Sequence, residues 1–505
     1  MVPGTMVKLL SGVRASRDLA HTYSFTSPEV QAAWMSSMLY GSYQTTDFTY
    51  QREAGKMRVP FNAESLHAVN YVMFQNANYS TKWFYAFVDS IEYKSESSSE
   101  ITFTIDPWQT YLFDITWRPS LIEREHVSND AIGLHRVPEN LDVGDLITIK
   151  QETINVSELC IVVASTYNPL TSTDAVGAVY SGVYQGCQFF TFSTTNVSGL
   201  NSFLASMAGK ESAVMGVFMY PKNLLGAAFV EGGAIAGTSA VSAIITFGAE
   251  RAALGAYTPR NNKLFTYPFT ALYGSNNNGG SAVWKMEDFS DPTDIEFLVS
   301  GDIGPNPTVY CMPFNYKSND ENYDEALALT QYPFCSWNYD TFKSYLAQNI
   351  VSAPLSIAGS AIGLATGIAT KNPLTIASGV IGMAETIGGF VEKSFLPNTS
   401  KGTLAGSGTV AVGAQTITLH QKSVNPQTAA IIDAFFDVYG YKTLRLDYPQ
   451  TAMDTRPHWN FLKLAESNIF GNMPHKYLTE LKNALRQGVT FWHDWDMYNY
   501  DRDNS

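Results

Sequence analysis

Residues with the types and spacing of nucleotide-binding motifs occur in this 505-residue chain, but each motif is incomplete. The stretch from Gly232 to Gly237 has the G-x-x-x-x-G frame of a phosphate-binding loop, yet Thr238 stands where the motif requires lysine. Residues 406–408 lack the third glycine of a dinucleotide fingerprint, and no G-x-S-x-G sequence of a serine hydrolase occurs. The motifs therefore predict neither nucleotide binding nor serine hydrolysis, and we expect no cofactor.

Two carboxylates have the spacing of a catalytic or metal-binding pair. Asp433 and Asp437 lie one helical turn apart, opposite a face formed by Ile432, Phe435 and Phe436. We therefore expect both acids on a solvated helix face. A glycan-cleaving carboxylate pair spread over different loops stays open as an alternative.

Histidines and cysteines give no metal-binding pattern. His126 and His493 each lack a second ligand at helical or turn spacing, so we expect both to be structural. The four cysteines contain no C-x-x-C pair, and we expect buried free thiols at Cys160, Cys187, Cys311 and Cys335. We therefore predict no metal site, and no motif positively indicates an enzymatic activity.

The composition limits the partners of the chain. Charged residues make up 15% of the sequence, below the roughly 25% of typical soluble domains, and aromatic residues make up 13%. The net charge of −14 argues against tight phosphate binding, although an acidic wall would let DNA slide past. No basic region followed by an apolar run occurs at the N-terminus, so we expect no signal peptide and assembly in a cytoplasm.

The expected elements are mainly strands, with some helices. Alternation of Trp83, Tyr85, Phe87, Ile91 and Tyr93 with their neighbours predicts a strand, within a hairpin over 82–106. Helices are expected near 27–38, over 428–439 with Ile431, Ile432, Phe435 and Val438 on one face, and over 474–487. Residues from about 151 to 340 are typical of an inserted, loop-rich α+β domain.

One segment is unusually apolar. From 345 to 384 the only charged residue is Lys371, which with Asn372 and Pro373 forms a polar tip between two apolar arms. As a helix the first arm would be about 31 Å long, close to the thickness of a hydrocarbon core. Gly359, Gly363 and Gly367 repeat at the spacing that lets helices approach closely in lipid.

Two explanations fit this segment, a membrane-active loop and a buried core hairpin rich in Gly and Ala. In water the first arm is a poor helix, since three interior glycines cost about 1 kcal/mol each. The free energy of inserting one copy into a membrane would be only about −2 to −4 kcal/mol, so several copies would have to act together. For a second uncharged stretch, 232–249, we favour a buried core or a loop because it is short.

Several blocks of the sequence have a recognisable pattern. The block from 71 to 127 is the specific one, at 71–79, 82–88, 92–94, 105–106, 109–110 and 125–127. Supporting blocks lie at 2–5, 7–9, 332–333 with 335, 439–442, and 488–490 with 492–493. These blocks resemble the distal tail-tube, or tail-knob, proteins of small short-tailed bacteriophages of the Picovirinae type, whereas residues 130–330 do not align.

The resemblance implies a structural virion protein that forms a hexameric tube for DNA ejection at the distal tail. The implied architecture is a β-barrel tube domain built from 1–150 and 401–505, insertion domains over 151–340, and a hydrophobic loop over 341–400. In this family the loop blocks the channel and then penetrates the host membrane. The loop residues implied here are Ile350, Val351, Leu355, Ile357, Gly359, Ile362, Gly363, Leu364, Gly367, Ile368, Leu374, Ile376, Val380, Ile381 and Ile387, and the tube-wall residues are Trp83, Tyr85, Phe87, Ile91 and Tyr93.

The resemblance also implies partners. These are other copies of the chain, a lower collar or proximal tail protein, a tail-tip protein that degrades the cell wall, viral DNA in passage, and the host cytoplasmic membrane. Two alternative functions stay open, a virion cell-wall glycan hydrolase and a receptor-binding module that stacks its aromatic residues on sugars.

Overall fold

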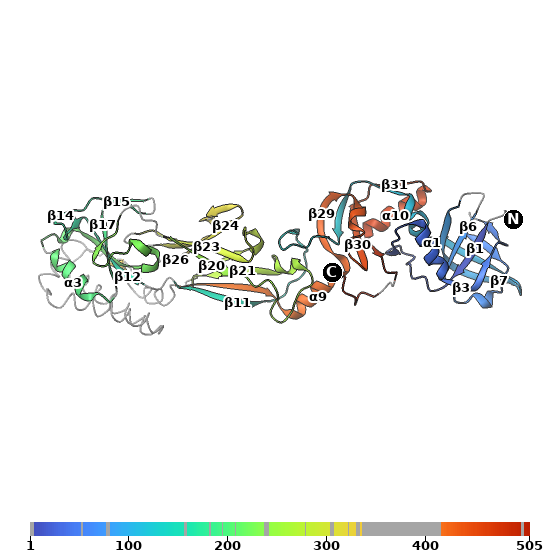
Figure 1. The fold of residues 1–505 in the computed structure, drawn as a ribbon, viewed down its shortest axis with the longest axis horizontal. Coiled ribbons are helices and arrows are strands. Elements are labelled where there is room, and N and C mark those ends of the chain that lie inside the picture. Colours follow the sequence, from blue (N-terminus) through green and yellow to red (C-terminus); the bar gives the residue numbers. More distant parts are fainter. Residues whose placement is uncertain are drawn as a thin grey trace, which may run out of the picture. The chain divides into compact units, whose positions relative to one another are not determined.

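The described part of the chain folds into two compact units (Figure 1). The computed structural model describes residues 5–504 except 52–53, 77–80, 156–158, 181–182, 194, 208, 237–241, 278, 304–307, 322, 330–333, 336–415 and 496–498. Unit 1 comprises Met1–Asp142, Pro259–Leu264 and Gln427–Ser505, and unit 2 comprises Val143–Thr258 and Phe265–Pro426. The backbone therefore passes between the units four times.

A seven-stranded antiparallel sheet forms the N-terminal part of unit 1. Its strand order is β3 (Leu39–Thr45), β1 (Met6–Leu10), β6 (Tyr71–Gln75), β7 (Trp83–Ser95), β8 (Ser98–Ile105), β5 (Lys56–Val59) and β4 (Thr49–Gln51). The two edge strands, β3 and β4, are consecutive in the chain, with only residues 46–48 between them. Because so short a connection joins the two edges, the sheet curves into a half-barrel.

The C-terminal residues complete a second sheet of unit 1. Its strand order is β2 (His21–Tyr23), β32 (Val489–Trp492), β30 (Trp459–Glu466), β10 (Ser120–Glu125) and β29 (Tyr441–Asp447). β9 (Ile115–Trp117) pairs with β31 (Ile469–Gly471), and the helices of this unit are α1 (Pro28–Ser37), α2 (Pro107–Tyr111), α9 (Pro426–Tyr439) and α10 (His475–Gln487). Strand β10 thus finds both of its neighbours more than 300 residues later in the chain.

Both faces of β6 and of the first half of β7 are buried, which explains the high aromatic content of these strands. The concave face packs a core that includes Val72, Phe74 and Phe103. The opposite face contributes Tyr71 and Tyr85 to a cluster with α1 and with the C-terminal tryptophans Trp459 and Trp492. Burial of these aromatic side chains stabilises the unit by about 1.5–3 kcal/mol each.

Strand β7 confirms the predicted hairpin but changes face along its length. Tyr85 and Phe87 lie on the outer face, whereas the register against β8 shifts between Val88 and Ser90. This β-bulge moves Ile91 to the concave face, so the expectation that it shares a face with Tyr85 was wrong. A bulge adds one residue to the strand, and period-two alternation in the sequence does not show it.

Unit 2 is built from three sheets and two small hairpins. One sheet has the order β11 (Leu146–Asn155), β28 (Thr416–Val424), β21 (Thr270–Ser275) and β22 (Ser281–Trp284). The second has the order β19 (Gly233–Ala234), β17 (Gln188–Ser193), β12 (Leu159–Ser165), β18 (Val214–Pro221) and β27 (Phe334–Cys335). The third has the order β20 (Ser242–Gly248), β23 (Asp294–Gly301), β24 (Val309–Tyr316) and β25 (Asn319–Glu321), with β26 (Leu327–Leu329) also on β24.

The remaining elements of unit 2 are short. β13 (Tyr167–Asn168) pairs with β14 (Thr173–Asp174), and β15 (Ala178–Tyr180) pairs with β16 (Val183–Gln185). In the part of unit 2 that the structure describes, the α-helices are α3 (Val197–Ser206) and α4 (Lys222–Leu225). The uncharged stretch 232–249 contributes β19 and β20, with Phe247 buried and Ile244 exposed, so part of it lies in the core as expected.

Local sequence signals predicted the helix ends well. α1 begins after Ser27, whose side chain accepts a hydrogen bond from the Val30 N–H, and α10 ends at Gly488. The predicted buried face of α9 was wrong, because Ile431 is 72% exposed and the buried residues are Ala429, Ile432, Asp433 and Phe436. The fold class is confirmed as mainly β with some α.

Candidate functional site: the acidic anchor of a crossing segment

The residues predicted for the membrane-active loop, 350–387, lie outside the described residues. Among the helices that the structure describes, none has the length and apolarity to span a bilayer. The predicted tube-wall residues lie on β7, where Tyr85 and Phe87 are buried, Trp83 and Ile91 are half-buried, and Tyr93 is 58% exposed.

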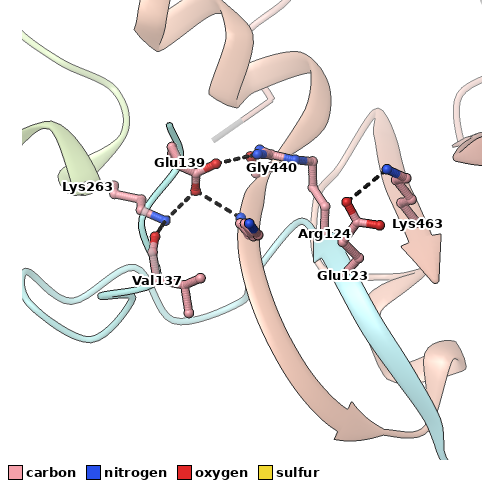
Figure 2. Close-up of polar contacts among 8 residues, drawn as sticks. Glu123, Arg124, Val137, Glu139, Lys263, Gly440 and Lys463 are labelled. Carbon is pink, nitrogen blue, oxygen red and sulfur yellow. Dashed lines mark hydrogen bonds and ion pairs between the residues drawn. The ribbon is translucent and has the colours of Figure 1, made fainter. Parts of the chain in front are cut away.

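A buried polar network in unit 1 surrounds Glu139, whose side chain is 1% exposed (Figure 2). Its carboxylate forms ion pairs with Lys263 and Arg124. One oxygen, Oε1, also accepts a hydrogen bond from the Lys442 backbone N–H at 2.9 Å. Glu139 therefore joins the loop after β10, β10 itself, β29 and the crossing segment 259–264.

The two cations of this network are held by further contacts. Lys263 Nζ donates to the Val137 carbonyl at 3.0 Å, and Arg124 Nη1 donates to the Gly440 carbonyl at 2.7 Å. Burial lowers the pKa of Lys263, and the nearby Glu139 carboxylate opposes that shift. Since every charge in the network has an opposite charge or a carbonyl beside it, the network can stay buried.

Helix α9 supplies the second half of the anchor through Asp433 and Asp437. Asp433 is fully buried, and its carboxylate accepts hydrogen bonds from the backbone N–H groups of Arg260 (2.8 Å) and Asn261 (3.1 Å). The Asn261 side-chain amide donates to Asp433 Oδ1 at 2.8 Å and to Asp437 Oδ1 at 2.7 Å. The expectation that both acids lie on a solvated face was therefore wrong for Asp433.

A fourth acid, Asp130, completes the set. Its Oδ2 accepts the Asn262 N–H at 2.8 Å, and its carbonyl accepts the Asn262 side-chain amide at 2.8 Å. Burial raises the pKa of Asp130 and of Asp437 above the usual range of aspartate. The segment 259–264 is thus bound by four acids, Asp130, Glu139, Asp433 and Asp437. We call these four acids the acidic anchor.

The geometry of the acidic anchor indicates a structural role. Asp433 and Asp437 have the spacing of a catalytic pair, but their oxygens accept hydrogen bonds from the segment 259–264. Among the described residues, no group of three His, Cys, Asp or Glu side chains could hold a metal ion. Sequence reasoning missed Glu139 and the crossing segment, whose only signal was the polar run from Arg260 to Lys263.

His126 lies beside the anchor and has a fixed tautomer. Its Nδ1 accepts the Phe461 backbone N–H at 2.8 Å, so Nε2 carries the proton and donates to the Asp437 carbonyl at 2.9 Å. The ring is 2% exposed, and burial lowers its pKa to about 3. His126 is therefore a neutral structural histidine, as expected.

His493 and the cysteines also have structural surroundings. His493 contacts the Asn460 side chain at 2.8 Å, and burial lowers its pKa. Cys160, Cys187 and Cys311 are buried free thiols, as predicted, and burial raises the pKa of Cys311 to about 12. A thiol with so high a pKa is a poor nucleophile at neutral pH.

The contribution of His126 to the stability of unit 1 is expected to fall in acid because the folded state holds this histidine neutral. The unfolded chain protonates it below about pH 6.5, whereas the folded chain does not until about pH 3. At this site the unfolded state therefore binds more protons in this window, and the contribution of His126 falls by about 3 kcal/mol between pH 6.5 and pH 4. Urea unfolding followed by tryptophan fluorescence would measure this loss, since most tryptophans lie in unit 1.

The variant His126→Gln serves as the control because glutamine can donate and accept hydrogen bonds without titrating. Asp106, Asp130 and Asp437 act in the opposite direction, since burial raises the pKa of each, that of Asp106 to about 6, and the folded state then binds more protons than the unfolded state. Subtracting the unfolding free energy of the variant from that of wild type at each pH removes their contribution. An identical pH dependence in both proteins would contradict the assignment.

Comparison with known proteins places this architecture in a family. A family model described as Bacillus phage phi29, Tail knob protein gp9, C-terminal domain, matches residues 236–505, more than half of the chain. This chain belongs to the tail knob protein family. A second model, Caudoviral major tail protein N-terminus, matches residues 3–116.

Relatives and a solved structure agree with the tail knob assignment over nearly the whole chain. The chain is 22% identical to tail knob protein gp9 of Bacillus phage PZA and 23% identical to that of phi29, each covering 99% of this chain and 98% of the relative. The structure of the bacteriophage C1 tail knob protein, gp12, matches with a TM-score of 0.63 at 14% identity, covering 99% of both chains. The predicted resemblance is confirmed, and the chain is a structural protein of the phage tail.

Proposed function

We propose that this tail knob protein forms a ring of six copies at the distal end of the tail, through which DNA leaves the virion. Membership of the tail knob family carries the proposal. The tube domain would combine 1–150 with 401–505, with 151–340 as insertion domains and 341–400 as the hydrophobic loop. The half-barrel sheet of unit 1, with β7 in its middle, is suited to form part of a tube wall.

The apolar segment supports a role at the host membrane. Residues 345–384 carry one charge, Lys371, and the first arm has the length of a membrane-spanning helix. We propose that this loop plugs the channel before ejection and then enters the host cytoplasmic membrane. The insertion free energy of one copy is only about −2 to −4 kcal/mol. A ring of copies that insert together multiplies this free energy.

The charge balance supports passage of DNA without binding. A net charge of −14 makes the chain repel phosphates, so DNA would not adhere to the channel. The proposed partners are a lower collar or proximal tail protein, a tail-tip wall-degrading protein and the host membrane. We propose no enzymatic role, since Asp433, Asp437 and His126 all bond to the protein itself.

Deletion of residues 351–391 tests the membrane role. We expect the deletion variant to assemble into the same ring as wild type, because the two sheets described for unit 1 are formed without these residues. The variant should release less than a tenth of the dye that wild type releases from liposomes. Native mass spectrometry would measure ring formation, and fluorescence dequenching would measure dye release.

A replacement of 351–391 by a Gly/Ser linker of equal length is the matched control for shortening the chain. It should behave like the deletion, because the proposal assigns the activity to apolar side chains. Undiminished leakage from either variant would refute the loop assignment. Failure of wild type to form rings would refute the proposal that the protein forms a channel for DNA.

A further inference from the structure

The hairpin formed by β15 and β16 presents an exposed apolar surface in unit 2. Its exposed residues are Val176 (77%), Val179 (39%), Val183 (48%) and Tyr184 (68%), which we call the hairpin tip. Val179 and Tyr184 are register partners, so their side chains lie on the same face of the hairpin. Leu170, in the adjoining β13–β14 hairpin, is 61% exposed.

The other face of the hairpin carries Tyr180 and its register partner Val183, and Tyr180 anchors this face to the core of unit 2. Tyr180 is 2% exposed, packs edge-on against Phe189 at 5.0 Å and donates a hydrogen bond to the Ile235 carbonyl at 3.4 Å. Tyr184 lies over Gly177, where a Cβ would come within 2.8 Å of its ring. The tip is therefore held in place while its apolar residues stay outside the core, at one end of unit 2 beside β17 (Figure 1).

The charge around the tip is unusually low. Between Glu158 and Lys210 the sequence carries a single charged residue, Asp174, although 15% of the whole chain is charged. The core strands β12 and β17 account for the apolar part of this stretch that is buried. The hairpins are not buried, so burial does not explain their lack of charge.

We propose that the hairpin tip binds the headgroup region of a lipid bilayer with no net charge. Exposed apolar patches mark interaction sites, and tyrosine prefers the boundary between headgroups and acyl chains. A nucleic acid or an anionic membrane would require lysine or arginine, and residues 166–187 contain neither. The inference rests on the proposed function, since it gives the ring a surface contact that precedes entry of the loop.

The test separates adsorption from pore formation. Flotation with phosphatidylcholine vesicles measures binding, and dye release from the same vesicles measures membrane permeabilisation by the loop. We use the full chain and the chain lacking 351–391, in which only the tip remains to bind. We expect both to float, and only the full chain to release dye.

A matched pair of double variants isolates the tip. Val176→Asp with Tyr184→Asp should lower flotation of the chain lacking 351–391 at least tenfold. Val283→Asp with Tyr267→Asp changes a valine and a tyrosine that are each 46% exposed elsewhere in unit 2, and should leave flotation unchanged. Because all four residues are exposed, circular dichroism and thermal melting should be the same for both variants.

Several results would overturn the proposal. These are equal flotation of the two double variants, no flotation of the chain lacking 351–391, binding only to vesicles that contain phosphatidylglycerol, and a change of ring order in the tip variant with unchanged flotation. The last result would assign the tip to contact between copies. Dye release by the full chain would still support the proposed function in each case.

Discussion

Replacing Glu139 with alanine is expected to destabilise unit 1 by about 3–5 kcal/mol. The substitution leaves Lys263 and Arg124 buried together without their shared carboxylate, and it removes the acceptor of the Lys442 N–H. Most of the cost comes from two like charges that lose their counter-ion away from water. Urea unfolding monitored by tryptophan fluorescence would measure the loss.

The chain offers a matched control for this change in the neighbouring pair Glu123 and Lys463 (Figure 2). These side chains pair at 2.8 Å but are 32% and 33% exposed, so Glu123→Ala should cost less than about 1 kcal/mol. The two glutamates differ mainly in burial. Equal effects of the two substitutions would show that the acidic anchor adds no more stability than a surface ion pair.

Substituting Gly440 with alanine is expected to have the second large effect, a loss of more than about 4 kcal/mol. Gly440 ends α9 with a positive φ of 64°, and its N–H donates to the Phe436 carbonyl at 2.8 Å. A Cβ at this position would overlap the Glu125 carbonyl and lie 2.6 Å from the His126 backbone N. Because these contacts are backbone atoms of β10 and its continuation, α9 and the start of β29 would have to move away from β10.

Gly12→Ala separates steric overlap from backbone strain. Gly12 has a φ of 76° in the same unit, but a Cβ there would meet no heavy atom within 4 Å. Its substitution should cost about 1 kcal/mol, the usual penalty for a left-handed alanine. If Gly440→Ala lowered the unfolding free energy no more than Gly12→Ala does, the result would contradict the close approach of the end of α9 to β10.

The elements that the sequence predicted correctly have local signals. Ser27 caps α1, Gly488 ends α10, and residues 95–98 mark the turn between β7 and β8. These signals lie within a few residues of the structure that they specify. Their physical causes, capping hydrogen bonds and turn conformations, are equally local.

The acidic anchor could not be predicted because its contacts are long-range. Asp433 is polar and sits among apolar residues of α9, so helical periodicity placed it on the solvated face. It is buried because it binds the backbone of Asn261, 172 positions earlier in the chain. Nothing near Asp433 in the sequence identifies that partner, and the same holds for Glu139 and Lys263, 124 positions apart.

The path of the backbone has a consequence for biosynthesis. Among the described strands, β10 pairs with β29 and β30 alone, and Gly440 follows Arg124 by 316 positions. At a ribosomal rate of about 5–20 residues per second, β10 waits roughly 16–60 s for its neighbours. A prematurely ended chain cannot close the five-stranded sheet, so the order of strands makes completed translation a checkpoint that each copy must pass before it can join the tail.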